Sequence, residues 1–268
     1  MISTKTTSKL YGYLSHHGYG SKIFSKIEYK LLQDQNKKFF NIGLNRAQAI
    51  QKLNLVLSGL YGQAYSEKKG MWSEHLILFS AISDIENPPK KILEIGTFNG
   101  ETTQILSALF PNSKITTLDL EFDEILKLKL YDYETKGKKL VHDREMNLKS
   151  LPNVTFLELN SLGLIDFHDK FDLIWIDGEH SYPIAPIDIS NSIRLLSSTG
   201  AAICDDVYLK ARDSNKDGRS TASIDSLESF SQANLIEFSL LHKRLGYFFN
   251  FSSSNKKYLG YIKRKPYN

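Results

Sequence analysis

The sequence has a single cysteine, Cys204, so no disulfide can form within the chain. Cys204 lies in the apolar run 200–204, where we expect a buried, unreactive thiol. No stretch approaches the about 18 consecutive apolar residues that a membrane-spanning helix needs. Residues 1–10 are polar and lack the apolar core of a secretion signal. These absences predict a soluble, cytoplasmic protein without a membrane partner.

Acidic residues are missing from the end of the chain. Residues 242–268 contain seven Lys and Arg and no Asp or Glu, and residues 1–86 contain eleven against six. The middle of the chain is therefore acidic, although the formal net charge of all 268 residues is +4. The basic ends suit an anionic substrate, a partner or nucleic acid, but a solvated charged surface is the simpler explanation. The length fits one large globular domain, or one domain with an appendage.

A third glycine is missing from the turn that follows the first predicted strand. Residues 91–95 have the apolar run of a buried parallel strand, and Gly96 and Gly100 bracket a tight turn before a helical pattern. A dinucleotide-binding turn has the pattern G-x-G-x-x-G, whereas three other residues separate the two glycines here. This spacing disfavours a pyrophosphate ligand, and the carboxylate of Glu94 suits a cationic one.

The stretch from Glu94 to Gly100 resembles the first motif of class I S-adenosylmethionine-dependent methyltransferases. That motif has an acid, an apolar residue and a glycine, then three residues and a second glycine. The resemblance implies an α/β, Rossmann-like fold with a seven-stranded, mostly parallel sheet, whose last strand is inserted antiparallel between its neighbours. It also implies S-adenosylmethionine as the cofactor, bound by the motif residues Glu94, Gly96, Thr97, Phe98, Asn99 and Gly100.

Two further strand ends provide candidate cofactor ligands. The predicted strand 114–119 ends in Asp119, 25 residues beyond Glu94, where a Rossmann-like unit places the carboxylate that accepts both ribose hydroxyls. The predicted strand 154–159 is followed by Asn160 and Ser161. The family often has a polar pair here that recognises adenine, so the resemblance implies that role for both residues. Ordinary turn chemistry explains an Asn-Ser pair almost as well.

Three aspartates follow the next two predicted strands. Asp177 comes directly after the apolar strand 171–176, and Asp205 and Asp206 come after the strand 201–204. Because the carboxyl ends of neighbouring parallel strands meet at one edge of a sheet, we expect these three carboxylates to lie together. Crowded carboxylates repel unless a cation or a shared proton relieves them. Ligation by oxygen alone predicts Mg²⁺ or a similar hard divalent ion.

His180 lies three residues beyond Asp177 on the same loop. The ordinary pKa of histidine suits a general base that takes the proton of a metal-bound hydroxyl. The alternative is a loop histidine that only pairs with a neighbouring carboxylate. The nearby aspartates favour the catalytic interpretation.

The motif D-G-E-H at residues 177–180, together with Asp205 and Asp206, resembles the metal-dependent sugar O-methyltransferases of antibiotic biosynthesis. This group includes macrolide and aminocoumarin deoxysugar methyltransferases and is related to the cephalosporin-methoxylation proteins. The resemblance spans roughly residues 70–210. It implies that Asp177, Asp205 and Asp206 bind magnesium, with His180 or Asp177 as the general base. The identity of the acceptor does not carry over, but vicinal oxygens that chelate an ion favour a sugar or another polyhydroxylated metabolite.

The rest of the chain completes the predicted organisation. Residues 1–86 are predicted to be a helical extension that helps to cover the active site, and residues 87–268 to be the cofactor-binding domain. Helices are predicted at 45–60, 72–85 and 223–232, and strands at 235–241 and 257–262. The polar loop 208–221 is predicted to be a mobile lid or an ordinary surface loop. The aromatic run 247–251 is predicted to be packing or a contact in a homo-oligomer, with a substrate platform as the alternative.

The sequence therefore predicts a methyltransferase that acts on a hydroxyl group of a small molecule. Two other classes remain open. A nucleic-acid methyltransferase would use the basic ends of the chain, but an acidic sheet edge disfavours a phosphate backbone. A non-catalytic, cofactor-binding assembly subunit would not need His180.

Overall fold

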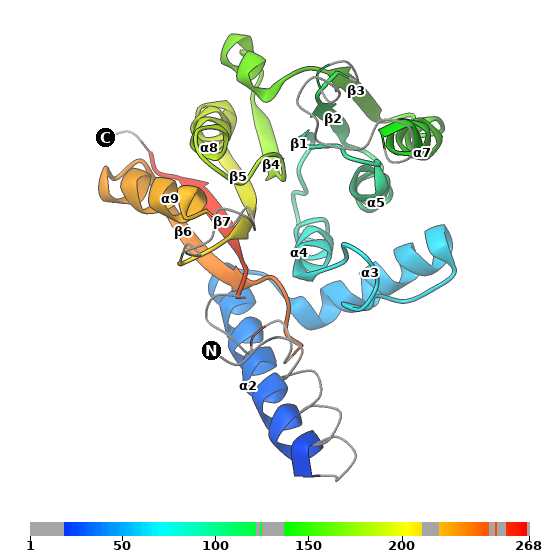
Figure 1. Cartoon of the computed structure of the whole chain (residues 1–268), viewed down its shortest axis with the longest axis vertical. Helices are drawn as coiled ribbons and strands as arrows, with labels where there is room; N and C mark the ends of the chain where they lie inside the picture. The colour runs from blue at the N-terminus through cyan, green and yellow to red at the C-terminus, as the bar shows by residue number, and fades with distance from the viewer. Residues whose placement is uncertain are drawn as a thin grey trace.

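The computed structural model describes residues 19–121, 124, 137–210, 220–246, 250 and 256–266. Its centre is a seven-stranded sheet with the strand order β3-β2-β1-β4-β5-β7-β6 (Figure 1). The strands are β1 (Lys91–Ile95), β2 (Lys114–Asp119), β3 (Val154–Glu158), β4 (Phe171–Ile176), β5 (Leu196–Val207), β6 (Ile236–His242) and β7 (Tyr258–Arg264). The pairings from β3 to β5 are parallel, and β7 is antiparallel to both β5 and β6. This topology confirms the predicted Rossmann-like methyltransferase fold.

Helices cover both faces of the sheet. The apolar residues of the central strands therefore alternate between two cores. On β4, Leu173 and Trp175 belong to one core and Ile174 and Ile176 to the other. The first core includes residues of α3 (Arg46–Tyr61), α4 (Glu74–Ile82) and α5 (Glu101–Leu109), and the second includes residues of α8 (Ile184–Leu195) and α9 (Ala222–Gln232). The other helices are α2 (Tyr19–Asn41), α7 (Lys138–Leu148) and the 3-10 helix η2 (Ser161–Asp166).

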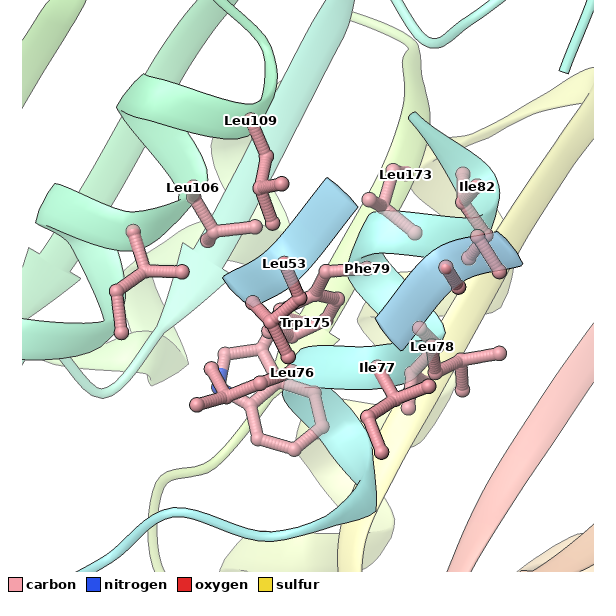
Figure 2. Packing of buried hydrophobic residues seen from close by; sticks show 14 of the residues in the cluster. Leu53, Leu76, Ile77, Leu78, Phe79, Ile82, Leu106, Leu109, Leu173 and Trp175 are labelled. Carbon is pink, nitrogen blue, oxygen red and sulfur yellow. The ribbon is translucent and has the colours of Figure 1, made fainter. Parts of the chain in front are cut away.

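Helix α4 belongs to the centre of the molecule, since all nine of its residues are buried. Phe79 meets Trp175 of β4 edge-on, with 5.1 Å between the ring centroids. Figure 2 shows the surrounding cluster, to which α3 contributes Leu53 and α5 contributes Leu106. The N-terminal helices therefore share the hydrophobic core of the sheet.

A buried ion pair also joins these helices to the sheet. Arg46 of α3 donates hydrogen bonds of 2.8 and 2.6 Å to the carboxylate of Glu74 on α4, and the two side chains are only 8% and 0% exposed. Gln35 of α2 donates to the same carboxylate and to the carbonyl of His242 at the end of β6, both at 3.0 Å. The polar groups of this contact satisfy one another, so burial leaves them hydrogen-bonded.

The predicted strands correspond closely to the observed ones except at β5, and helices α2 and α8 were not predicted individually. The fifth strand was predicted to start at residue 201, whereas β5 starts at Leu196, which pairs with Phe171. Ser197, Ser198 and Thr199 are typical of a loop. They lie where the register of β5 against β4 shifts, between the partners of Phe171 and Leu173. Most of the predicted lid at 208–221 and of the aromatic run at 247–251 lies outside the described residues. Within the described ranges, no helix is both long and apolar enough to cross a membrane.

Candidate active site

The turn after β1 lies in backbone contact with the loop after β4. Gly96 has a φ of 97°, and its N–H donates to the carbonyl of Leu118 at 2.9 Å. A Cβ atom at Gly96 would collide with the backbone carbonyl of Asp177, because β1 and β4 are neighbours and their carboxyl ends meet there. Gly96 therefore lets the predicted cofactor motif and the predicted acidic centre share one edge of the sheet.

Glu94 lies beneath this turn. Its side chain is fully buried, and its Oε2 accepts hydrogen bonds from the hydroxyls of Thr103 (2.5 Å) and Thr117 (2.6 Å). Burial raises the pKa of Glu94 to about 7 although both hydrogen bonds lower it. Its Oε1 has no hydrogen-bond partner in the described part of the chain. Glu94 therefore stabilises the turn by linking β1 to Thr103 of α5 and Thr117 of β2.

The other motif residues shape the turn above Glu94. The hydroxyl of Thr97 lies 2.7 Å from that of Thr117, so this side chain points into the protein. Phe98 has a φ of 50° and a side chain that is 44% exposed. Asn99 accepts a hydrogen bond from the N–H of Glu101, at 3.1 Å, and Gly100 is the N-cap of α5. The turn thus presents the N-terminus of α5 to the edge of the sheet.

Asp119 lies at the same edge, at the end of β2. Its Oδ2 accepts a hydrogen bond of 2.6 Å from the N–H of Phe98, and its Oδ1 accepts one of 2.8 Å from the N–H of Leu120. Each carboxylate oxygen can accept more than one hydrogen bond, so both remain able to receive hydroxyl donors from a ligand. The contact with Phe98 fixes the carboxylate beside the glycine turn.

Asn160 and Ser161 follow β3 along the same edge. The Oδ1 of Asn160 accepts a hydrogen bond from the N–H of Leu162 at 3.1 Å and caps η2. The main chain after β3 stays close to β2, because the N–H of Leu159 donates to the carbonyl of Asp119 at 2.8 Å. The structure therefore places the pair beside Asp119, and the side chain of Asn160 already has the turn contact expected of Asn.

Three side chains converge at the ends of β4 and β5. Ligand atoms of Asp177, His180 and Asp205 all lie within 4.8 Å of one another. Nε2 of His180 is 3.5 Å from Oδ1 of Asp177. Burial and the neighbouring Asp205 carboxylate raise the pKa of Asp177 well above its usual range. The arrangement pairs a titratable imidazole with an acid that tends to hold a proton, which is suited to proton transfer.

Asp206 is not part of this convergent group among the described residues. Its backbone has a φ of 47°, and its carboxylate lies 2.5 Å from the Nζ atoms of both Lys243 and Lys257. Lys243 also lies 2.5 Å from Oδ2 of Asp205. Burial would raise the pKa of Asp205, but the ammonium group of Lys243 outweighs it and holds that pKa below its usual range. Two lysines therefore neutralise the acids that the sequence assigned to a metal ion.

Comparison with known proteins supports a methyltransferase. Residues 93–207 match the family model described as a methyltransferase domain. These residues run from β1 through Asp205 and Asp206 and include every predicted site residue from Asp119 to Asp206. Residues 93–207 are therefore similar to a methyltransferase domain. A search of the curated protein sequences finds no match.

Solved structures share the fold of the methyltransferase domain at low sequence identity. An O-methyltransferase from Bacillus cereus in complex with SAH has a TM-score of 0.50 and 19% identity, and the match covers 80% of this chain and 91% of that one. TomG, an O-methyltransferase from Streptomyces achromogenes involved in tomaymycin synthesis, has a TM-score of 0.50 and 15% identity, with coverages of 87% and 98%. A proposed O-methyltransferase from Klebsiella pneumoniae has a TM-score of 0.51 and 17% identity, with coverages of 82% and 90%.

His75 is one site residue that sequence reasoning missed. It stacks on Trp175 with ring centroids 5.1 Å apart, and its Nδ1 lies 2.6 Å from the hydroxyl of Ser73. Burial lowers the pKa of His75 to about 3, although the nearby Asp205 carboxylate opposes this shift. The N-terminal helices thus bring a neutral imidazole close to the acidic group of the methyltransferase domain.

Lys243 and Lys257 were missed for a topological reason. Lys243 follows β6 and Lys257 precedes β7, so both lie where these two strands meet the edge formed by the ends of β4 and β5. The sequence did contain a signal, since a basic residue directly after a predicted strand of the same sheet is placed at its carboxyl edge. The basic end of the chain was interpreted as solvated surface, whereas Lys243 is 4% exposed.

Proposed function

We propose that the protein is an S-adenosylmethionine-dependent O-methyltransferase that acts on a hydroxyl group of a sugar or another polyhydroxylated metabolite. One observation carries this proposal: the glycine turn after β1 and the Asp177–His180 pair are in backbone contact through Gly96. A cofactor on the turn would therefore present its reactive end to the pair that can accept a proton. Proximity of this kind accounts for much of the rate gain in group transfer.

Side chains at three strand ends would hold the cofactor. The turn from Gly96 to Gly100 would lie against its amino-acid part, and Asp119 would accept the two ribose hydroxyls. Asn160 and Ser161, beside Asp119, would face the adenine. The carboxylate of Asp119 at this edge favours a sulfonium cation over a phosphate. S-adenosylmethionine carries that cation.

His180 would act as the general base in a single displacement. Its Nε2 takes the proton of the acceptor hydroxyl while the hydroxyl oxygen forms a bond to the methyl carbon. The carbon–sulfur bond breaks, and its electron pair stays on sulfur. Asp177, with its Oδ1 3.5 Å from Nε2, would orient the imidazole. We propose a sugar or another polyhydroxylated metabolite as the acceptor, because the carboxylate and imidazole groups at this edge can hydrogen-bond several hydroxyls.

Magnesium stays a prediction, and the three predicted ligands do not fit it in this arrangement. Asp205 and Asp206 are both hydrogen-bonded to Lys243 at 2.5 Å, and Asp206 has a second lysine at the same distance. An ion bound by all three aspartates would have to displace a buried ammonium group. No step of the proposed transfer therefore relies on a divalent ion.

Binding of S-adenosylhomocysteine tests the cofactor site directly. We expect wild-type protein to bind it in calorimetry. Asp119→Asn should weaken binding by about 1.5–3 kcal/mol, or about 10- to 100-fold, because the ribose hydroxyls lose a charged acceptor. Glu121→Gln is the matched control, since this carboxylate is exposed and two residues away. Absence of binding to the wild-type protein would contradict the proposal. If the wild-type protein binds the cofactor, transfer of label from methyl-labelled S-adenosylmethionine to a member of a panel of sugars identifies the acceptor.

A further inference from the structure

Lys243 is held in place at the acidic centre from two sides. Its backbone carbonyl accepts a hydrogen bond from the N–H of Glu74, and its N–H donates to the carbonyl of Lys257, both at 3.0 Å. The side chain is buried, and its Nζ reaches Oδ2 of Asp205 and Oδ1 of Asp206, each at 2.5 Å. The ammonium group therefore bridges the two adjacent aspartates.

This bridge occupies the position between Asp205 and Asp206 in which the sequence predicts a divalent ion. A magnesium ion binds carboxylate oxygens at about 2.1 Å. At that distance from Asp205 and Asp206, it would lie beside an ammonium group that is already bonded to both of them. Two cations at such short range repel strongly where little water screens them. The charge on the acids is also already balanced, because Lys257 pairs with the second oxygen of Asp206 at 2.5 Å.

We propose that Lys243 is the resident cation of the acidic centre and that it takes the place of a divalent metal ion there. The ammonium group fixes the two aspartate side chains and leaves Asp177 and His180 to face the acceptor. Hydroxyl methylation in this chain therefore proceeds without a divalent ion, and only this last statement rests on the proposed function. The proton goes to His180, as above, so the reaction is balanced without a further reactant.

Manganese binding tests the proposal without an acceptor. Mn²⁺ is titrated into the full-length, EDTA-treated and dialysed protein, and the bound ion is measured by the loss of the free-ion signal in electron paramagnetic resonance. The variants are Lys243→Met, which removes the charge, and Lys243→Arg, which keeps it. Lys263→Met is the matched control, because Lys263 is also on the β6–β7 hairpin but pairs with Ala201, four residues before Asp205 in β5.

We expect the wild-type protein, Lys243→Arg and Lys263→Met to bind no stoichiometric Mn²⁺ in the range up to about 1 mM, and Lys243→Met to bind one ion at least about tenfold more tightly than wild type. Adding Asp205→Asn to Lys243→Met should abolish the gain. Stoichiometric binding to the wild-type protein at micromolar concentration would overturn the proposal. So would a folded Lys243→Met variant that gains no binding. If that variant does not fold, the wild-type titration alone decides.

Calorimetry with S-adenosylhomocysteine, in Mg²⁺ and in EDTA, separates this proposal from the proposed function. Equal cofactor binding in both buffers, with no Mn²⁺ bound, supports both proposals. Cofactor binding together with stoichiometric Mn²⁺ in the wild-type protein overturns only the role of Lys243. No cofactor binding, together with a gain of Mn²⁺ binding in Lys243→Met, overturns only the methyltransferase proposal.

Discussion

Single residues decide how closely the glycine turn after β1 approaches the loop after β4. Gly96 is the clearest case, because its positive φ and the carbonyl of Asp177 both exclude a side chain. The motif glycine could be recognised in the sequence from its place after a strand. The atom that it must avoid comes from a strand about 80 residues later, and no local pattern reveals it.

Gly96→Ala should destabilise the protein by about 2–3 kcal/mol, because the new methyl group forces the turn or the β4 loop to move. It should also abolish binding of S-adenosylhomocysteine. Urea unfolding and calorimetry measure the two effects. Gly59→Ala is the control: Gly59 lies within α3 with open space around it, and the change should stabilise by about 0.5–1 kcal/mol. Equal effects of the two substitutions would contradict this account of Gly96.

The buried carboxyl of Glu94 should make stability depend on pH. Its pKa is raised from the ordinary value of 4.5 to about 7 in the folded protein, so the folded state binds more protons than the unfolded state between these values. Stability should therefore fall as pH rises from about 4.5 to 7, by about 3 kcal/mol for this group alone. Thr103, Thr117 and Asp119 are the polar and charged groups that affect it.

Glu94→Gln tests this dependence, because the amide keeps the shape of the side chain and cannot titrate. Unfolding free energies measured at pH 5 and pH 8 should differ less in the variant than in the wild-type protein. Asp177 also has a raised pKa, so some pH dependence will persist in the variant. An unchanged difference between the two pH values would show that Glu94 is ionised throughout this range.

At the scale of elements, the sequence was sufficient for most of the sheet. The runs at 91–95, 114–119 and 171–176 are the observed strands β1, β2 and β4, because each is a compact apolar segment bounded by turn residues. The early part of β5 was not predicted, since its Ser and Thr residues are typical of a loop and its pairing with β4 is irregular there. Local preference and pairing agree in the first three cases, whereas the irregular start of β5 leaves no local pattern to recognise.

The candidate site was only partly predictable for a related reason. Asp177 and His180 follow β4, and Asp205 lies near the end of β5, so the parallel topology alone brings them to one edge. The cation that pairs with Asp205 comes from a part of the chain 38 residues later, because Lys243 follows β6. The acids were therefore predicted, but the cation that relieves their repulsion was missed, because the basic end of the chain was interpreted as solvated surface.

At the scale of the whole molecule, the N-terminal helices and the sheet share one hydrophobic core. The division at residues 86 and 87 remains a prediction about the chain, but α4 lies in the core and Glu74 joins α2, α3 and the end of β6. Loss of the Glu74 contact should therefore destabilise the whole molecule, including the segment that holds Lys243.

Glu74→Ala should lower the free energy of unfolding by about 3–5 kcal/mol, because it leaves the guanidinium of Arg46 buried without its partner. The double variant Arg46→Met with Glu74→Met should lose less, since it removes both charges and keeps apolar volume. Urea unfolding of the single and double variants measures the difference. A loss below about 1 kcal/mol in Glu74→Ala would mean that the ion pair contributes little.

The antiparallel insertion of β7 has an evolutionary consequence. Since β7 runs opposite to β6, the start of one strand and the end of the other meet the same edge, and the connection between them begins and ends with a lysine that pairs with Asp206. The positive charge of the centre is thus encoded in one short, contiguous part of the gene. Exchange of the β6–β7 hairpin alone would remove both lysines and leave an acidic centre that is open to metal ions. The strand ends that would hold the cofactor would be inherited unchanged.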